Sequence, residues 1–368
     1  MQYPAFTAQN VTSLRLEAQQ KGLFLPVSES TAALEQTELL HGREIKNRKV
    51  MQITFVSDAT EQGAPTEATV QRYAAAASSS AGMVWSEPIA ICPEGRMDKA
   101  QLCLTQETLP AFTAMVSAMR QAAQNQGEAA PILIAVLDHA GRYAMIPQPV
   151  DRCPVLSHES AALISDETLS KLIVTVGETA RLAEQAGFDG IAIHAAHRNL
   201  FSESLAAFSR DGVFGGDFED RTRFLRDCFT AASLTVNNSF LCIRLNLYDG
   251  IPQPHGWGMA FEDAYAPDLS EPSLLLRVLH ELYDVTLVSC EAGDPHYNPY
   301  VQCPVEGDNL PEHPLVGISR LCTCTAMIDS ALQQNVKLIL PNCSYLQQLA
   351  PHLGAGMIAE EFASFAVL

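Results

Sequence analysis

Two histidines, His194 and His197, stand three residues apart in the segment Gly-Ile-Ala-Ile-His-Ala-Ala-His-Arg-Asn, which begins as an apolar run. A run of this kind is typical of a buried strand, so the pair would lie where the chain leaves that strand. Two imidazoles placed in this way can donate hydrogen bonds to one substrate oxygen or anion. Two structural polar side chains at a rim would have the same spacing, so the spacing alone leaves both interpretations open.

Arginine, histidine and tyrosine side chains accompany other apolar runs. Arg244 interrupts the run Cys-Ile-Arg-Leu-Asn, where a charge costs free energy unless an anionic ligand or a structural carboxylate pairs with it. His139 and Arg142 follow one run, and His296 and Tyr297 follow another. This concentration of polar side chains at the ends of apolar runs favours a ligand site.

Eight apolar runs alternate with segments of helical character, and the runs are continuous, as in strands buried on both faces of a parallel sheet. The predicted strands are Val50–Val56, Met83–Ser86, Ile132–Leu137, Gly190–His194, Leu241–Leu247, Val285–Ser289, Val336–Leu340 and Phe362–Leu368. The predicted helices are Thr66–Ser78, Leu109–Gln126, Asp166–Gln185, Phe218–Ser233, Glu271–Leu282, Thr323–Gln334 and Tyr345–Glu360, the last interrupted near Pro351 and Gly354. This alternation predicts a TIM (β/α)8 barrel, whose catalytic groups come from the C-terminal strand ends. An open doubly wound sheet is disfavoured because the first run is followed by SDATEQGAPTE, which lacks a G-x-G-x-x-G turn.

The chain is predicted to form one barrel domain over residues 47–368, preceded by an extension. Residues 1–46 are expected to contribute a helix and a hairpin-like cap. Because the eighth predicted strand ends the sequence, the closing helix of the barrel is expected to be missing or shortened.

Composition indicates a globular protein of 368 residues with a net charge of −19, which disfavours nucleic acid as a partner. The ten cysteines are scattered, which indicates reduced thiols and a cytoplasmic location. The close pair Cys322-Thr-Cys324 lacks the C-x-x-C spacing of metal sites, so neither a metal ion nor an iron–sulfur cluster is expected. We expect no signal peptide and no membrane span, since a basic-then-apolar leader and an uncharged apolar stretch of about 18 residues are both missing.

The same segments, in the same order, resemble the old yellow enzyme family of flavin-dependent barrels. The nearest branch is that of NADH:flavin oxidoreductases related to 2,4-dienoyl-CoA and 2-enoate reductases. The resemblance runs from about residue 30 to the end and agrees in order, spacing and strand placement. The matching segments are 45–48, 82–87, 93–96, 139–142, 186–197, 214–223, Arg244, 256–258, 295–300 and 344–346.

The resemblance implies FMN at the barrel mouth and hydride transfer from a nicotinamide through the flavin to an activated alkene. His194 and His197 would hold the carbonyl oxygen of the substrate, and Arg244 would face the flavin ring. The resemblance gives cofactor-binding roles to Arg244, Ser86 and His139, and substrate-binding roles to His296, Tyr297 and Arg142.

Several positions depart from the family pattern. The proton-donating tyrosine is replaced by Asn199, which cannot supply the roughly 10²- to 10⁴-fold rate gain of a general acid. The phosphate loop reads Leu-Pro-Asn-Cys from residue 340, and Pro341 has no N–H to donate to a phosphate. The other departures are Ile53-Thr54 for Pro-Met, Val136 for a ring-binding glutamine, Pro88 for a small residue, and no Gly-Arg pair after the eighth strand.

Three hypotheses follow. The first, which we adopt, is a divergent FMN-dependent oxidoreductase acting on a small-molecule substrate. The second is a flavin-free relative that is a non-catalytic subunit or binds another anionic ligand. The third is a metal-dependent hydrolase or lyase using His194, His197 and His139, which lacks an obvious strand-end carboxylate. The first two allow a homo-oligomer or a complex with a paralogous subunit.

Overall fold

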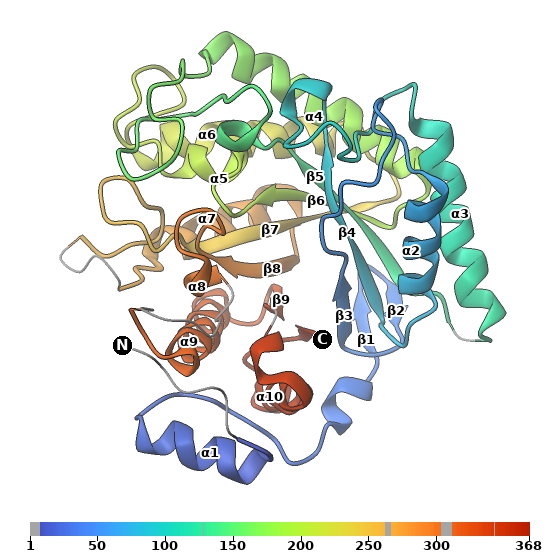
Figure 1. Ribbon diagram of the computed structural model, residues 1–368, viewed down its shortest axis with the longest axis vertical. Coiled ribbons are helices and arrows are strands. Elements are labelled where there is room, and N and C mark those ends of the chain that lie inside the picture. Colours follow the sequence, from blue (N-terminus) through green and yellow to red (C-terminus); the bar gives the residue numbers. More distant parts are fainter. Residues whose placement is uncertain (1–7, 128, 262–265, 303–310, 342) are drawn as a thin grey trace.

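A closed barrel of eight parallel strands forms the molecule, in the order β10-β3-β4-β5-β6-β7-β8-β9, with helices connecting successive strands (Figure 1). The computed structural model describes residues 8–127, 129–261, 266–302, 311–341 and 343–368. The barrel strands are β3 (Lys49–Gln52), β4 (Met83–Ala90), β5 (Ile132–Asp138), β6 (Gly190–Ala195), β7 (Phe240–Tyr248), β8 (Leu287–Ala292), β9 (Lys337–Leu340) and β10 (Phe365–Val367). The predicted (β/α)8 barrel is confirmed.

Helices lie outside the strands, as in other barrels of this class. They are α1 (Val11–Gln20), α2 (Glu67–Ala77), α3 (Leu109–Asn125), α4 (Asp166–Ala186), α5 (Leu200–Leu205), α6 (Phe218–Ser233), α7 (Ser270–Tyr283), α8 (Pro299–Gln302), α9 (Pro314–Leu332) and α10 (Ala350–Ala359). Short 3₁₀ turns are η1 (Ala32–Glu35), η2 (Pro93–Gly95), η3 (Gly141–Tyr143) and η4 (Ser344–Leu349).

The continuous apolar runs become strands because both of their faces are covered. Every residue of β5 and of β6 is buried, so neither strand needs a polar face. Gly190 begins β6 where a Cβ atom would lie 2.5 Å from Ile134 Cδ1, so a larger residue there would displace the side chains packed against it. Each of the eight predicted runs contains or overlaps one barrel strand, with shifted ends.

Two helix predictions need correction. Helix α9 begins at Pro314, nine residues before the predicted start at Thr323. The interruption of the last helix lies at Gln347, which has φ 50°, instead of near Pro351 and Gly354. Pro351 stands in the first turn of α10, where a missing N–H costs nothing. Gly354 lies inside α10 and does not interrupt it. A glycine suits this position because a Cβ atom there would lie 2.7 Å from the Cβ of Ala366.

The segment before the barrel forms a helix and a hairpin, as the sequence predicts. The hairpin strands are β1 (Glu38–Leu40) and β2 (Arg43–Ile45). Leu40 and Ile45 join the buried cluster inside the barrel with Val50 and Trp85, so the hairpin closes the end where the strands begin. Helix α1 contributes to a second buried cluster with α9 and α10, and it lies beneath them in Figure 1.

Helix α9 is the most apolar long helix of the described chain. By length and composition alone its 19 residues could cross a membrane, but 56% of its apolar window is buried inside the protein. Leu315 and Ile318 lie in the buried cluster with α1 and α10, which is typical of a core helix.

The nine cysteines within the described residues are free thiols, and eight of them are buried.

Candidate functional site

A pocket of about 240 Å³ opens at the end of the barrel where the strands finish. It is lined from β3, β4, β6, β7 and β8 and the loops that follow β3, β6 and β9, which is where barrel enzymes place their sites. The structure therefore brings together the three residues that the strand-end argument selected, His194, His197 and Arg244. We call this cavity the mouth pocket. Its lining residues are Gln52, Ile53, Thr54, Phe55, Pro88, His194, His197, Arg244, Glu291 and Pro341.

His194 is held from behind by a carboxylate. It lies on β6 and pairs in register with Arg244 of β7, so both side chains stand at the same level of the barrel. Its Nδ1 lies 3.0 Å from Asp138 Oδ1, which also accepts a hydrogen bond of 2.8 Å from Asn199 Nδ2. The opposite nitrogen, Nε2, is buried and has no hydrogen-bond partner among the described residues. A polar atom in this state is satisfied by a ligand or water more often than left alone.

His197 lies beyond the end of β6 with its ring 5.6 Å from that of His194, at an angle of 76°. Its Nε2 is 3.5 Å from Arg244 Nη2 and 3.7 Å from Glu291 Oε2. Burial, together with the positive charge of Arg244, lowers the pKa of His197 to about 3. The ring is therefore neutral at physiological pH, and its Nε2 accepts from the guanidinium of Arg244.

Arg244 is paired with a carboxylate that the sequence reasoning missed. Its Nε donates to Glu291 Oε1 at 2.8 Å, and Ser289 Oγ donates to the same oxygen at 3.0 Å. Gln52 Nε2 adds a longer contact of 3.4 Å. Burial raises the pKa of Glu291, but the charge and hydrogen bond of Arg244, together with His197 and the hydrogen bond from Ser289, lower that pKa overall. The charge in the apolar run Ser-Cys-Glu-Ala is the signal that could have revealed Glu291, as it revealed Arg244.

Two predicted cofactor-binding residues do not line the mouth pocket. Ser86 is buried within the sheet, where its Oγ donates to Glu87 O at 2.8 Å and accepts from Val136 N at 2.9 Å. Both bonds lie where the register between β4 and β5 shifts. His139 accepts from Gly141 N at 3.0 Å, and burial lowers its pKa to about 4.

The predicted substrate-binding residues also lie outside the mouth pocket. Arg142 is fully buried, pairs with Glu203, and donates to two backbone carbonyls at 2.8 Å. His296 is exposed on the loop after β8 and stacks on Tyr143, with ring centroids 4.1 Å apart. Tyr297 is on the same loop and is 39% exposed. Arg142 therefore makes structural contacts, and His296 and Tyr297 lie on the exposed loop after β8.

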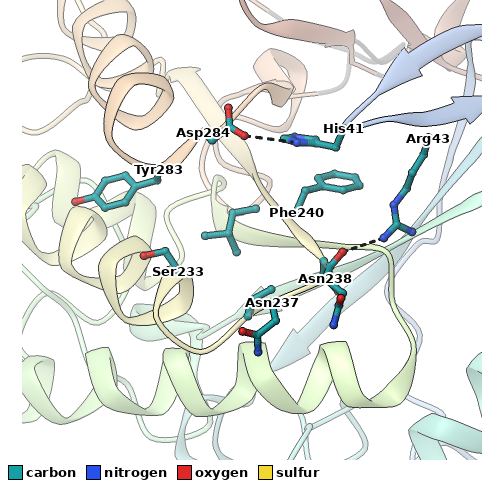
Figure 2. A pocket seen from close by; sticks show the side chains of 11 residues that line it. His41, Arg43, Ser233, Asn237, Asn238, Phe240, Tyr283 and Asp284 are labelled. Atoms are coloured by element: carbon teal, nitrogen blue, oxygen red, sulfur yellow. Dashed lines mark hydrogen bonds and ion pairs between the residues drawn. The ribbon is translucent and has the colours of Figure 1, made fainter.

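A second pocket, of about 310 Å³, lies at the opposite end of the barrel between the hairpin and the start of β7 (Figure 2). His41 stacks on Phe240 and its Nε2 lies 2.7 Å from Thr286 Oγ1. Arg43 donates to Asn238 O at 2.9 Å and pairs with Asp189 at 2.5 Å. None of the buried side-chain atoms found without partners in the described chain belongs to a residue that lines this pocket.

The mouth pocket joins apolar walls to a polar edge. Ile53, Phe55 and Pro88 offer apolar surface, whereas the histidines, Arg244 and Glu291 offer hydrogen-bonding groups. This combination suits a flat, heteroatom-rich ring or a small polar substrate. The fold and site together define a barrel with a strand-end ligand site.

The family model for the NADH:flavin oxidoreductase / NADH oxidase family matches residues 40–262. The match covers more than half of the chain, so this protein belongs to that family, and the resemblance to the old yellow enzymes is confirmed. Glu291 and Pro341 of the mouth pocket lie beyond the matched residues.

Curated relatives agree with this assignment. An NADPH dehydrogenase of Listeria welshimeri is 28% identical over 231 residues, which are 61% of this chain and 64% of that protein. An NADPH dehydrogenase of Bacillus cytotoxicus is 30% identical over 217 residues, covering 57% and 60%. The chain therefore spans less than two thirds of the length of these relatives.

Solved structures share the fold. A 2-naphthoyl-CoA reductase complex has a TM-score of 0.74 at 17% identity and covers 92% of this chain and 50% of that one. The old yellow enzyme homologue from Zymomonas mobilis has a TM-score of 0.66 at 21% identity, with coverage of 91% and 88%. At these identities the likeness establishes the barrel architecture alone.

Proposed function

We propose that this protein is an FMN-dependent oxidoreductase of the old yellow enzyme type that transfers hydride to an activated alkene. The observation that carries the proposal is His194, held by Asp138 on one side, with a buried and unpartnered Nε2 in a residue that lines the mouth pocket. The family membership gives the reaction class, and His194 gives the group that would bind the substrate oxygen.

The donor set of the mouth pocket fits the ring of FMN. Apolar side chains of Ile53, Phe55 and Pro88 would cover the ring, while Gln52 and Arg244 would meet its polar edge. Pro341 stands where the resemblance places the phosphate loop and offers no N–H, and Asn342 lies outside the described residues. When bound, FMN supplies the hydride that passes between a nicotinamide and the alkene.

The residues of this chain would polarise the substrate. With a proton on Nε2, His194 would donate to the carbonyl oxygen as negative charge develops there, and Asp138, 3.0 Å from Nδ1, would hold the ring in place. Asn199 orients Asp138 through its amide instead of donating a proton to the substrate. The proton added to the alkene would therefore come from water.

A flavin-free barrel is the second candidate, and the Arg244–Glu291 pair favours it. The carboxylate neutralises the cation that would face the flavin, at 2.8 Å. The cavity of about 240 Å³ is also smaller than the roughly 300–1,000 Å³ of most ligand pockets. For the metal-dependent alternative, His139 would have to join the histidine pair, but its ring packs against Gly95 outside the mouth pocket.

The deciding experiment is the visible absorbance spectrum of the purified protein before and after equilibration with FMN and desalting. The proposal expects a flavin band that remains with the protein and is bleached by NADPH or NADH under anaerobic conditions. Protein that stays colourless after equilibration would overturn the proposal and select the flavin-free candidate.

We also propose a cytoplasmic protein that acts on a small molecule, with neither nucleic acid nor membrane as a partner. The net charge of −19 supports the exclusion of nucleic acid, and the free thiols support a reducing compartment. A homo-oligomer or a complex with a paralogous subunit remains the expected assembly, and light scattering after size-exclusion chromatography measures it.

A further inference from the structure

Two adjacent residues that are not glycine, His197 and Arg198, both have a left-handed backbone, each with φ 59°. The left-handed region is unfavourable for residues that carry a Cβ atom. Gln333 and Gln334 form a second such pair at exposed positions, so the contacts around residues 197 and 198, and not the conformation alone, decide what this pair does. His197 is one of the two histidines of the mouth pocket, so whatever holds this backbone also sets the direction of its ring.

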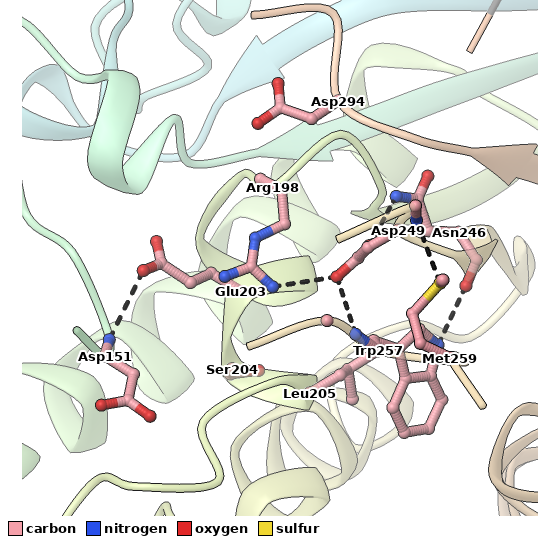
Figure 3. A network of polar contacts seen from close by, with 12 residues as sticks. Asp151, Arg198, Glu203, Ser204, Leu205, Asn246, Asp249, Trp257, Met259 and Asp294 are labelled. Atoms are coloured by element: carbon pink, nitrogen blue, oxygen red, sulfur yellow. Dashed lines mark hydrogen bonds and ion pairs between the residues drawn. The ribbon is translucent and has the colours of Figure 1, made fainter. Parts of the chain in front are cut away.

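One buried carboxylate, that of Asp249, contacts Arg198 directly and is linked to His197 through Asn246; Figure 3 shows Asp249 with Arg198 and Asn246. Its Oδ2 accepts from Arg198 Nη1 at 2.9 Å. Its Oδ1 accepts from Asn246 Nδ2 at 2.8 Å, and Asn246 Oδ1 accepts from the backbone N–H of His197 at 3.3 Å. Asp249 therefore reaches Arg198 directly and His197 through one amide.

Asp249 is itself fixed by the turn after β7. It exchanges backbone and side-chain bonds with Trp257, accepting from Trp257 N at 3.0 Å and donating its own N–H to Trp257 O at 2.9 Å. Asn298 Nδ2 donates to the Asp249 carbonyl at 3.0 Å. Asp249 is fully buried and Arg198 is 1% exposed, so water does not compete for these bonds.

The charge on Arg198 is maintained in this environment. Burial lowers the pKa of Arg198, but the carboxylates of Asp249 and Glu203 outweigh it and raise that pKa overall. A buried arginine without its carboxylate would cost several kcal/mol. The ion pair between Arg198 and Asp249 is therefore stronger than an ion pair of a surface arginine.

We propose that Asp249 is the positioning residue of the mouth pocket, holding the left-handed turn at residues 197–198 so that His197 points at the same space as His194. The consequence for substrate binding rests on the proposed function, but the positioning itself is a property of the protein without ligand. Loss of the anchor lets residues 197 and 198 relax to negative φ and swings the His197 ring away from Arg244 and Glu291.

The test is Asp249→Asn, with the His197 ring followed by NMR of protein labelled with ¹⁵N-histidine. In the parent protein the pKa of His197 is held at about 3 by burial beside Arg244. Release of the ring to solvent raises that pKa by about 1 unit or more toward the ordinary value. His139, whose pKa is about 4, does not contact Asp249 and serves as the internal reference that stays unchanged.

Asp166→Asn is the control because it removes the carboxylate partner of another buried arginine, Arg210, at 2.6 Å, without touching the turn; the Asp166 side chain itself is 34% exposed. If Asp249→Asn does not fold, Asp249→Asn combined with Arg198→Gln replaces it, since the double variant removes both charges of the buried pair and leaves neither uncompensated. A folded variant in which the pKa of His197 is unchanged would overturn the proposal. FMN uptake is measured separately, so failure of the proposed function leaves this result readable.

Discussion

The two ends of the barrel each have a polar pocket, and they differ in how their polar groups are satisfied. The pocket at the strand starts is larger, at about 310 Å³ against 240 Å³ for the mouth pocket. In it, His41 and Arg43 of the hairpin already have partners, Thr286 and Asn238, in the turns before β8 and β7. In the mouth pocket His194 keeps a buried nitrogen without a partner, and Glu291 compensates Arg244 next to it.

The volume of a pocket therefore does not identify the ligand site. A pocket whose polar atoms are bonded to one another gains little from a ligand, because each new hydrogen bond replaces an old one. A pocket with an unsatisfied buried atom gains from any ligand that reaches it. Near Arg198, by contrast, the Asp249 carboxylate accepts from Arg198, Asn246 and Trp257, so both of its oxygens are bonded (Figure 3).

The largest expected effect distinguishes the two pockets by their histidines. In the FMN-loaded protein, His194→Ala lowers kcat/KM for reduction of a cyclic enone by about 10²- to 10³-fold, as loss of one oxyanion donor does. His41→Ala, in the other pocket, changes kcat/KM by about twofold or less. Steady-state kinetics with both variants check this. Equal effects of the two substitutions would remove the distinction between the pockets.

A second prediction uses the pH dependence of stability. The folded pKa of His197 is about 3 because of burial beside Arg244, against 6.5 in the unfolded chain. Below pH 6.5 only the unfolded state takes up the proton, so stability is present above this pH and is lost as pH falls toward 3. From pH 7 to pH 5 this one group accounts for about 2 kcal/mol of lost stability.

Urea unfolding at the two pH values measures that loss. His197→Asn flattens the pH dependence, since asparagine takes up no proton. His41→Asn flattens it less, because burial lowers the pKa of His41 but this ring is only half-buried. A His197→Asn protein with the parent pH dependence would mean that the ring is solvated in solution.

The barrel and three polar residues of its mouth pocket could be predicted from the sequence for one physical reason. Buried parallel strands are continuous apolar runs, and their polar ends meet at one face, so His194, His197 and Arg244 were predicted together. Glu291 was missed because the predicted strand ended at Ser289, whereas β8 extends to Ala292 and carries Glu291 into the pocket. The directions of Arg142 and His296 depend on loop conformation, which periodicity does not encode.

The smallest expected effect concerns the charge of the mouth pocket. Glu291→Gln keeps the side-chain size but leaves Arg244 uncompensated, so an anionic ligand gains a free cation. We expect FMN to bind about tenfold more tightly, a change of about 1.4 kcal/mol, measured by quenching of FMN fluorescence. Asp284→Asn makes the same acid-to-amide change beside His41 in the other pocket, in a left-handed position that asparagine tolerates, and leaves FMN binding unchanged. Weaker FMN binding by Glu291→Gln would show instead that the carboxylate itself contacts the cofactor. The mouth pocket would then resemble the pocket at the strand starts, with its acid–base pair serving as a fixed part of the binding surface.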